Sequence, residues 1–209
     1  MPKPLVNIVG RPMLFWLLDN LNFKPRDTLW VGAQKELDAV YEIEARLRRE
    51  YPCLDLRVIL VDFQTRGAAE TLFILLQHMP PSDFRRKIIC LDCDTIYFSG
   101  DVLEDFRACP GDCGCSFYFK DQGDKASFKP GTSTITNIRE KVAISRHANN
   151  GAYAFPCGAQ VRNTCRKVLD NPVGKAGEFY TSTIIAKMIS AGLKVRVFPI
   201  MALHFRGTP

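Results

Sequence analysis

The sequence lacks the features that define several protein classes. No run of apolar residues approaches the ~18 needed to cross a bilayer, and residues 1–4 begin no long apolar stretch of the kind found in a signal peptide. There is no internal repeat, no low-complexity segment and no linker-like stretch. These absences predict a single-domain cytoplasmic protein with no membrane partner.

An excess of one charge sign is also largely missing. The chain has 28 Lys and Arg against 22 Asp and Glu, a net charge of +6, and the basic residues are scattered. A mild, scattered excess suits small anionic ligands better than a nucleic-acid groove, so no nucleic-acid partner is expected. The apolar content of 46% and the length of 209 residues are those of a globular protein with a full core.

Cysteine, in contrast, is well represented, with 8 residues. Cys90-x2-Cys93 and Cys109-x3-Cys113 approach the spacing of zinc ligands. However, Cys90 lies within a strand pattern, and cysteines of this kind are usually small core residues in a reducing compartment. We therefore expect core packing rather than zinc sites or disulfides.

The apolar pattern alternates between strand and helix. In the first half, the pattern predicts strands at residues 28–31, 56–61 and 87–91, and helices at residues 13–21, 34–50 and 68–79. This order is typical of a doubly wound, mostly parallel, Rossmann-like α/β sheet. In the second half, predicted strands at residues 113–120, 133–138, 152–155 and 194–198, with helices at 159–169 and 180–191, indicate a mixed sheet.

Two carboxylates follow one of the predicted strands. Asp92 and Asp94 come directly after the apolar run at residues 87–91, and in open α/β sheets ligands bind beyond the carboxyl ends of the strands. Two such side chains can hold a hard divalent cation, which in turn can grip nucleotide phosphates. They can equally be ordinary loop acids, one capping a helix and one solvated, and the tripeptide alone leaves both interpretations open.

A series of short motifs extends over nearly the whole chain. In order, they are Lys3-Pro4-Leu5, Gly10-Arg11-Pro12-Met13, Gln64-Thr65-Arg66-Gly67-Ala68-Ala69-Glu70-Thr71, Asp94-Thr95-Ile96-Tyr97, Arg139-Glu140-Lys141-Val142, Asn150-Gly151-Ala152-Tyr153 and Gly207-Thr208-Pro209. In order and spacing they resemble the motifs of the sugar-phosphate nucleotidyltransferases, the pyrophosphorylases that make nucleotide-activated sugars.

The resemblance implies a nucleotide-diphospho-sugar transferase fold, with residues 1–110 as a nucleotide-binding half and residues 111–209 as an acceptor-binding half. It also implies nucleotidyl transfer from an NTP, preferably a pyrimidine nucleotide, to a sugar phosphate or a similar phosphorylated acceptor. Pyrophosphate would be released. The product would serve activated-sugar or surface-polysaccharide biosynthesis.

The same resemblance implies roles for particular residues. Mg²⁺ would be held by Asp94 with Asp92 in support. The implied catalytic residues are Lys3, Asp94 and Lys141, of which Lys141 would neutralise the acceptor phosphate. The implied base-recognition residues are Gln64, Gly67, Ala68 and Ala69. The implied acceptor-binding residues are Glu140, Asn150 and Gly151.

Two departures from the family pattern stand out. Phe205 occupies the position of the family's second metal-binding aspartate, with His204 beside it. The family also has a first strand and a G-x-G-x-R phosphate loop, which residues 1–209 do not contain. In the family that strand lies between the strands that match residues 28–31 and 87–91, so we expect poor solubility or capture of another strand in its place.

Alternatives therefore remain open. A non-catalytic or truncated relative could keep the fold for binding or regulation. A metal-dependent glycosyltransferase could use Asp92-Cys93-Asp94 as a D-x-D motif. Homo-oligomerisation is compatible with each interpretation.

Overall fold

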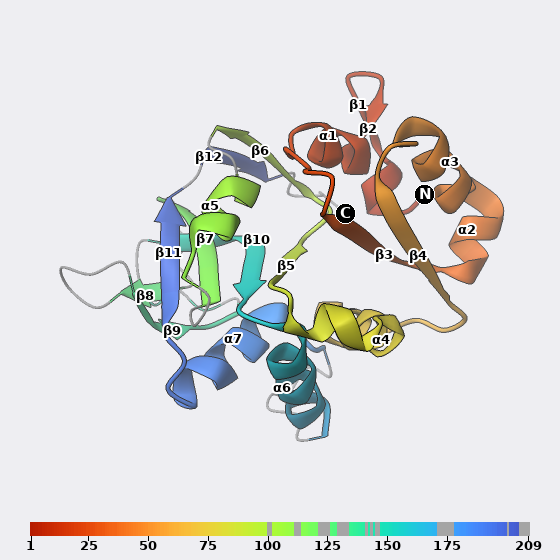
Figure 1. Ribbon diagram of the computed structural model, residues 1–209. Helices are drawn as coiled ribbons and strands as arrows, with labels where there is room; N and C mark the ends of the chain where they lie inside the picture. The colour runs from red at the N-terminus through yellow and green to blue at the C-terminus, as the bar shows by residue number, and fades with distance from the viewer. Residues whose placement is uncertain are drawn as a thin grey trace.

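The computed structural model describes residues 1–99, 102–110, 114–120, 126–128, 134–140, 142, 144, 147–170, 178–199 and 201–204. Figure 1 shows helices and strands alternating along the chain, with the first part of the chain on one side and the later strands on the other. The helices are α1 Met13–Asp19, α2 Lys35–Tyr41, α3 Ile43–Glu50, α4 Ala68–His78, α5 Val102–Ala108, α6 Gly158–Asp170 and α7 Thr181–Ser190, with short 3₁₀ turns η1 Lys3–Leu5 and η2 Pro81–Arg85. The strands are β1 Asn7–Ile8, β2 Arg11–Pro12, β3 Thr28–Gln34, β4 Asp55–Val61, β5 Ile88–Leu91, β6 Thr95–Ser99, β7 Gly114–Lys120, β8 Ala126–Phe128, β9 Ile135–Ile138, β10 His147–Phe155, β11 Val195–Pro199 and β12 Met201–His204.

The strands form a parallel pair and a larger mixed sheet. β3 and β4 are parallel and in register from Thr28 opposite Asp55 to Gln34 opposite Val61. The six-stranded sheet has the order β11-β7-β10-β8-β9, with β5 also paired to β10. Within it β7 and β11 are parallel, and β10 is antiparallel to its neighbours. The predicted α/β class with a mixed C-terminal half is confirmed.

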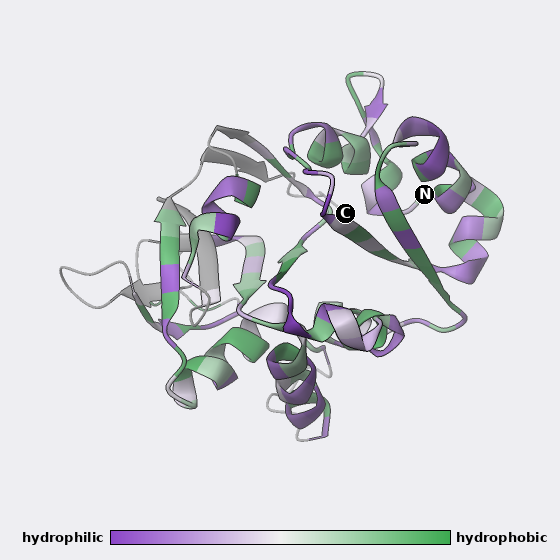
Figure 2. Cartoon of the chain, viewed as in Figure 1, coloured by the Kyte–Doolittle hydropathy of each residue, from purple (hydrophilic) through white to green (hydrophobic). Residues whose placement is uncertain are grey.

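The apolar side chains gather in two clusters. The first core cluster is built around α1 and includes Leu14, Phe15, Leu17, Leu18 and Leu47. The second core cluster lies among α4, α6 and α7 and includes Leu72, Leu76, Val161, Ile184 and Ile185. Figure 2 shows α7 as mostly hydrophobic and α6 as mostly hydrophilic, in agreement with the deeper burial of α7.

β3 and β5 belong to separate sheets. Within the described part of the chain, β3 pairs with β4 alone and β5 pairs with β10 alone. Figure 1 shows β3 beside β4 and β5 beside β10. The predicted strands at residues 28–31 and 87–91 are therefore not neighbours in a ladder.

Two expectations for secondary structure were wrong. The single helix predicted at residues 34–50 is two helices, because β3 continues through Gln34 and Glu42 adopts a left-handed conformation with φ 51° and ψ 44°. Asp38 stabilises the break, since its Oδ1 accepts a hydrogen bond from the Glu44 N–H at 2.8 Å. A further strand, β8, also forms between the strands predicted at residues 113–120 and 133–138, where no strand was expected. None of the described helices is long and apolar enough to span a bilayer.

Candidate functional site

Asp92 and Asp94 lie directly beyond the carboxyl end of β5. The Asp92 N–H donates to the Gly151 carbonyl oxygen at 2.9 Å, which continues the contact between β5 and β10. Gly151 has φ +83°, and a Cβ there would lie 2.5 Å from Asp92 Oδ2. Glycine is required here because any side chain would displace the carboxylate. The structure thus brings together Asp92 and Gly151, which are far apart in sequence.

Two asparagines shape the Gly151 turn. The register between β10 and β7 shifts here, as in a β-bulge. Asn149 Oδ1 accepts from the Gly151 N–H at 2.7 Å, and Asn150 Oδ1 accepts from the Ala152 N–H at 3.3 Å. Each side chain therefore bonds the N–H two residues ahead, the pattern of an Asx turn. Asn150 is fully buried beneath the turn, so the geometry gives it a structural task, and its contact with substrate stays a prediction.

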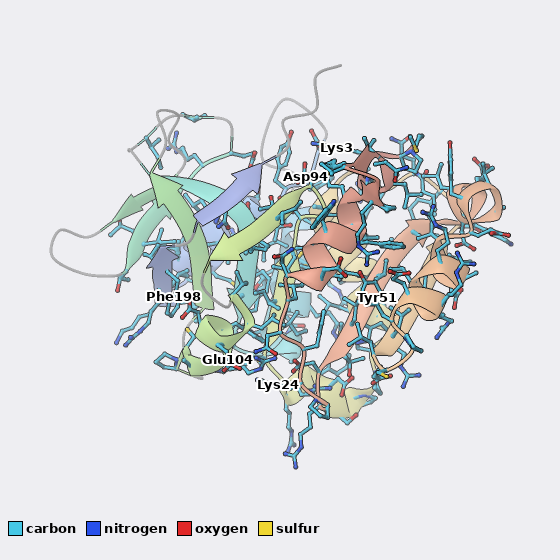
Figure 3. All side chains as sticks on the ribbon, turned by 90° about the horizontal axis from the view of Figure 1, so that it is seen from above. Lys3, Lys24, Tyr51, Asp94, Glu104 and Phe198 are labelled. Carbon is cyan, nitrogen blue, oxygen red and sulfur yellow. The ribbon has the colours of Figure 1, made fainter. Side chains whose placement is uncertain are left out.

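Asp94 is paired with the amino end of the chain. Lys3 Nζ lies 2.6 Å from Asp94 Oδ2 although 91 residues separate them. Figure 3 shows the two side chains meeting beside β6. Their side chains remain 44% and 30% exposed, so the pair is accessible to a ligand. A pair this exposed contributes only about 0–1 kcal/mol to stability, which leaves both charges available for a binding role.

The negative charge of this region raises the pKa values of two buried tyrosines. Burial raises the pKa of Tyr97 well above its ordinary value, and the Asp92 and Asp94 charges raise it further. Burial also raises the pKa of Tyr153, with further contributions from Asp92 and Glu140. Three carboxylates therefore act on one buried region beside β5. A cation bound there would relieve part of their mutual repulsion.

Glu140 is tied to the amino end of α7. It follows β9, and Ser182 Oγ donates to Glu140 Oε2 at 2.8 Å. The hydrogen bond orients the half-buried carboxylate toward the same region as Asp92. Ser182 carries no signal in the sequence, because the partners lie 42 residues apart on different elements. Lys141 lies outside the described residues, as do Phe205 and residues 207–209.

The loop before α4 is held against the chain that precedes α7. The Phe179 N–H donates to the Arg66 carbonyl oxygen at 2.8 Å, and the Ala69 N–H donates to the Phe179 carbonyl oxygen at 3.0 Å. Gly67 has φ +138°, and a Cβ there would lie 2.5 Å from that same Phe179 oxygen. The Phe179 backbone thus packs directly against Gly67. Ala69 is fully buried, whereas the two remaining predicted residues of the loop, Gln64 and Ala68, are exposed.

Arg66 reinforces this loop. Its guanidinium pairs with Glu70 at 2.5 Å and lies 4.6 Å from the centre of the Phe179 ring. The stacked cation and the two backbone hydrogen bonds fix the loop to residues 179–182.

The same segment also contacts β5 through Thr181. Burial and the Asp92 charge raise the pKa of the Cys90 thiol to about 12, whereas a hydrogen bond with the adjacent Thr181 hydroxyl lowers it. Residues 179–182 therefore touch the loop, Glu140 and β5 together.

The two carboxylates suit a magnesium ion whose remaining coordination positions are filled by water and a bound ligand. No cluster of three or more histidine, cysteine or acidic side chains suited to a metal occurs in the part of the chain that the structure describes. Mg²⁺, however, commonly takes only one or two protein carboxylates, with water and substrate phosphates filling its other positions. Asp92 and Asp94 match that requirement in number and chemistry.

The comparisons with known proteins bear on the fold. Neither a protein-family model nor a curated protein matches the sequence. Among solved structures, the nucleoside-diphosphate-sugar pyrophosphorylase from Vibrio cholerae RC9 is similar, with a TM-score of 0.80 and 17% identity, over 98% of this chain and 87% of that one. HddC from Yersinia pseudotuberculosis gives a TM-score of 0.65 and 15% identity, over 98% and 84%. The chain has the nucleotide-diphospho-sugar transferase type of fold that its motifs predicted.

Proposed function

We propose that the protein is a nucleotidyltransferase that joins an NTP, preferably a pyrimidine nucleotide, to a sugar phosphate or a similar phosphorylated acceptor. The observation that carries the proposal is the seating of Asp92 on Gly151, beside the Lys3–Asp94 pair, at the carboxyl end of β5. The two aspartates and the lysine lie at the edge where open α/β sheets bind ligands. The pyrophosphorylase likeness in fold supports the same chemistry.

In this reaction, a phosphate oxygen of the acceptor attacks the α-phosphorus of the NTP, the bond to the β-phosphate breaks and pyrophosphate leaves. Such transfer depends mainly on positioning and on neutralisation of charge. Asp94 and Asp92 would hold Mg²⁺, which supplies positive charge to the phosphates. Lys3 stands beside Asp94 and offers an ammonium group to a phosphate oxygen at the same edge.

The acceptor would bind on the side of Glu140. This carboxylate is held by Ser182 and can accept hydrogen bonds from hydroxyl groups of a sugar. Lys141 is assigned to the acceptor phosphate because it follows Glu140 directly. On the nucleotide side, the exposed amide of Gln64 can read the edge of a pyrimidine, while Gly67 holds the loop against Phe179. The product would feed activated-sugar or surface-polysaccharide synthesis.

The test is to incubate the protein with each of the common NTPs, a panel of sugar phosphates and Mg²⁺. Pyrophosphate release and the mass of the nucleotide-linked product are the readouts. Asp94→Asn should abolish Mg²⁺-dependent nucleotide binding, measured by calorimetry. Glu104→Gln is the matched control, since the Lys24–Glu104 pair is an exposed ion pair at 3.0 Å far from the site (Figure 3). Equal nucleotide affinity with and without Mg²⁺ would contradict the assignment.

A parallel assay separates the alternatives. If Asp92-Cys93-Asp94 served a glycosyltransferase, the protein would consume a nucleotide sugar and an acceptor and would release a nucleoside diphosphate. A non-catalytic relative would bind nucleotide in calorimetry and give no product in either assay. Product from an NTP and a sugar phosphate, lost in Asp94→Asn and kept in Glu104→Gln, distinguishes the proposed function from both.

A further inference from the structure

Lys3 and Asp94 are joined by a single ion pair. Lys3 Nζ lies 2.6 Å from Asp94 Oδ2, and among the described residues neither side chain makes a second ion pair. The Asp19 carboxylate differs, since it accepts hydrogen bonds from both Arg11 and Tyr51. An exposed pair with one point of contact contributes little to stability, and it can open without loss of packing. The Lys3–Asp94 pair is therefore suited to an exchange of partners.

The backbone of Lys3 is anchored, while its side chain can move. η1 begins at Lys3, and Leu5 in the same turn is 3% exposed within the first core cluster. The Val6 N–H donates to the Lys3 carbonyl oxygen at 3.1 Å and closes the turn. The Lys3 side chain, in contrast, is 44% exposed, and lysine carries its charge on a flexible four-carbon stem. The ammonium group can therefore leave Asp94 while the backbone of Lys3 stays beside it.

The ammonium group occupies the carboxylate that a metal ion would need. Mg²⁺ binds carboxylate oxygens at about 2.1 Å. On either oxygen of Asp94 the ion would lie close to the Lys3 ammonium, which is 2.6 Å from Oδ2. Two cations on one carboxylate repel each other, because the repulsion grows as their separation falls. Lys3 must therefore leave Asp94 when a metal ion binds there.

The displaced ammonium group requires another anion. In the proposed reaction the NTP brings its phosphates to this edge of the sheet, and lysine binds phosphate as a point charge. A metal ion alone would leave Lys3 without a partner, whereas a metal ion and a nucleotide together would give it one. Lys3 therefore opposes the binding of metal alone and favours the binding of metal with nucleotide.

We propose that Lys3 is an internal placeholder for the metal ion and makes metal binding depend on the nucleotide. In the free protein the ammonium group occupies Asp94. With both ligands bound, it contacts a phosphate oxygen instead. This inference rests on the proposed function, because it takes Asp94 as a metal ligand and an NTP as a substrate.

The first test measures metal and nucleotide binding separately in Lys3→Met, which removes the charge of the side chain. Without nucleotide, the variant should bind Mn²⁺ about three- to fivefold more tightly than the parent protein in calorimetry, because the competing ion pair is gone. With saturating Mg²⁺, it should bind UTP and CTP about tenfold more weakly, because the contact with phosphate is lost. Lys24→Met removes one charge from the exposed Lys24–Glu104 pair (Figure 3), and this matched control should change neither affinity.

A second test separates an exchange of partners from a simple loss of charge. In EDTA, Asp94→Asn should release Lys3 to the nucleotide. Lys3→Met should then weaken UTP binding at least about threefold more in the Asp94→Asn background than in the parent protein, whereas independent effects would give the same factor in both. Melting curves check that each variant is folded, and Lys3→Gln takes the place of Lys3→Met if the apolar side chain destabilises the protein.

The outcomes distinguish this inference from the proposed function. Changes of the same sign in the affinities for Mn²⁺ and UTP, or an equal effect of Lys3→Met in both backgrounds, would overturn the placeholder role. Unchanged Mn²⁺ affinity in Lys3→Met would also overturn it, and would leave the proposed metal site and function standing. Absence of Mn²⁺ binding from both the parent protein and Lys3→Met would overturn the metal assignment of the proposed function as well.

Discussion

Asp92 lies so close to Gly151 that the missing side chain of the glycine is part of the site. A Cβ at residue 151 would meet the Oδ2, Cβ and Cγ atoms of Asp92 at 2.5, 2.8 and 2.8 Å. The main chain at Gly151 thus bounds the Asp92 carboxylate, and the backbone N–H of Asp92 donates a hydrogen bond to the Gly151 carbonyl oxygen.

Gly151→Ala should therefore damage the site as well as the fold. Gly192→Ala is the matched control, because Gly192 has a similar φ of +89° but nothing within 4 Å of its would-be Cβ. Both substitutions should cost about 1–3 kcal/mol of backbone strain, read from denaturant unfolding. Gly151→Ala alone should weaken Mg²⁺-dependent nucleotide binding by about tenfold or more. Equal nucleotide affinity in the two variants would refute a role for the contact.

Ser182→Ala should affect the acceptor selectively. The variant loses the hydroxyl that orients Glu140, and a hydrogen bond to a charged group contributes about 1.5–3 kcal/mol. We expect the KM for the sugar phosphate to rise by roughly tenfold, with little change in the KM for the NTP. Ser190→Ala is the control, since Ser190 Oγ bonds the Lys187 carbonyl at the other end of α7. An equal rise for both substrates would indicate a general folding defect.

Lys141→Ala should weaken acceptor binding far more than NTP binding. A lost point charge acts mainly on the group that it touches. Calorimetry with the sugar phosphate and with the NTP, measured separately, checks this expectation. Lys187→Ala, a lysine on the last turn of α7, controls for the loss of one positive charge. Comparable losses for the two ligands would show that Lys141 is not specific to the acceptor.

The Asp19 carboxylate should make stability depend on acid pH. Burial would raise the pKa of Asp19, but hydrogen bonds from Arg11 at 2.5 and 2.8 Å and from Tyr51 at 2.8 Å outweigh it and hold the pKa below its usual value. The stabilisation is complete above an unfolded-state pKa of about 4 and disappears as the pH falls through the lower folded-state value.

Asp19→Asn should lower the free energy of unfolding by about 1–2 kcal/mol at pH 7. The difference from the parent protein should hold down to about pH 4 and shrink below it. Urea titrations of both proteins at a series of pH values from about 2.5 to 7 measure this difference in the free energy of unfolding. Arg11→Met should remove most of the same pH dependence. A difference that stays constant to the lowest pH would show that the pKa of Asp19 is not depressed in the folded protein.

The sequence predicted those features that a local pattern of residues encodes. The strands at residues 28–31 and 56–61 and the helix at 68–79 were placed by periodicity, and Asp92 and Asp94 by their position after an apolar run. The break at Glu42 was missed because glutamate favours helix and nothing local marks a left-handed residue. Burial of Ile43 and Leu47 against the first core cluster gives α3 its own packing face.

Contacts across the chain could not be predicted in the same way. The Lys3–Asp94 and Ser182–Glu140 pairs join residues 91 and 42 positions apart, and neither pair follows a sequence period. Gly67 was predicted to be a base-recognition residue, and the sequence did not indicate that the Phe179 carbonyl oxygen would lie against it. A glycine marks a need for space without identifying what fills it.

Residues 179–182 support two parts of the proposed site at once. Phe179 carries the loop at Arg66 and Gly67, and Ser182, three positions later, carries Glu140. In an enzyme with the proposed sites, a nucleotide that draws the loop inward also moves the support of the acceptor carboxylate. Linkage then requires that the nucleotide and the acceptor change each other's affinity by the same factor. Under such reciprocity, either substrate that binds first strengthens the binding of the other.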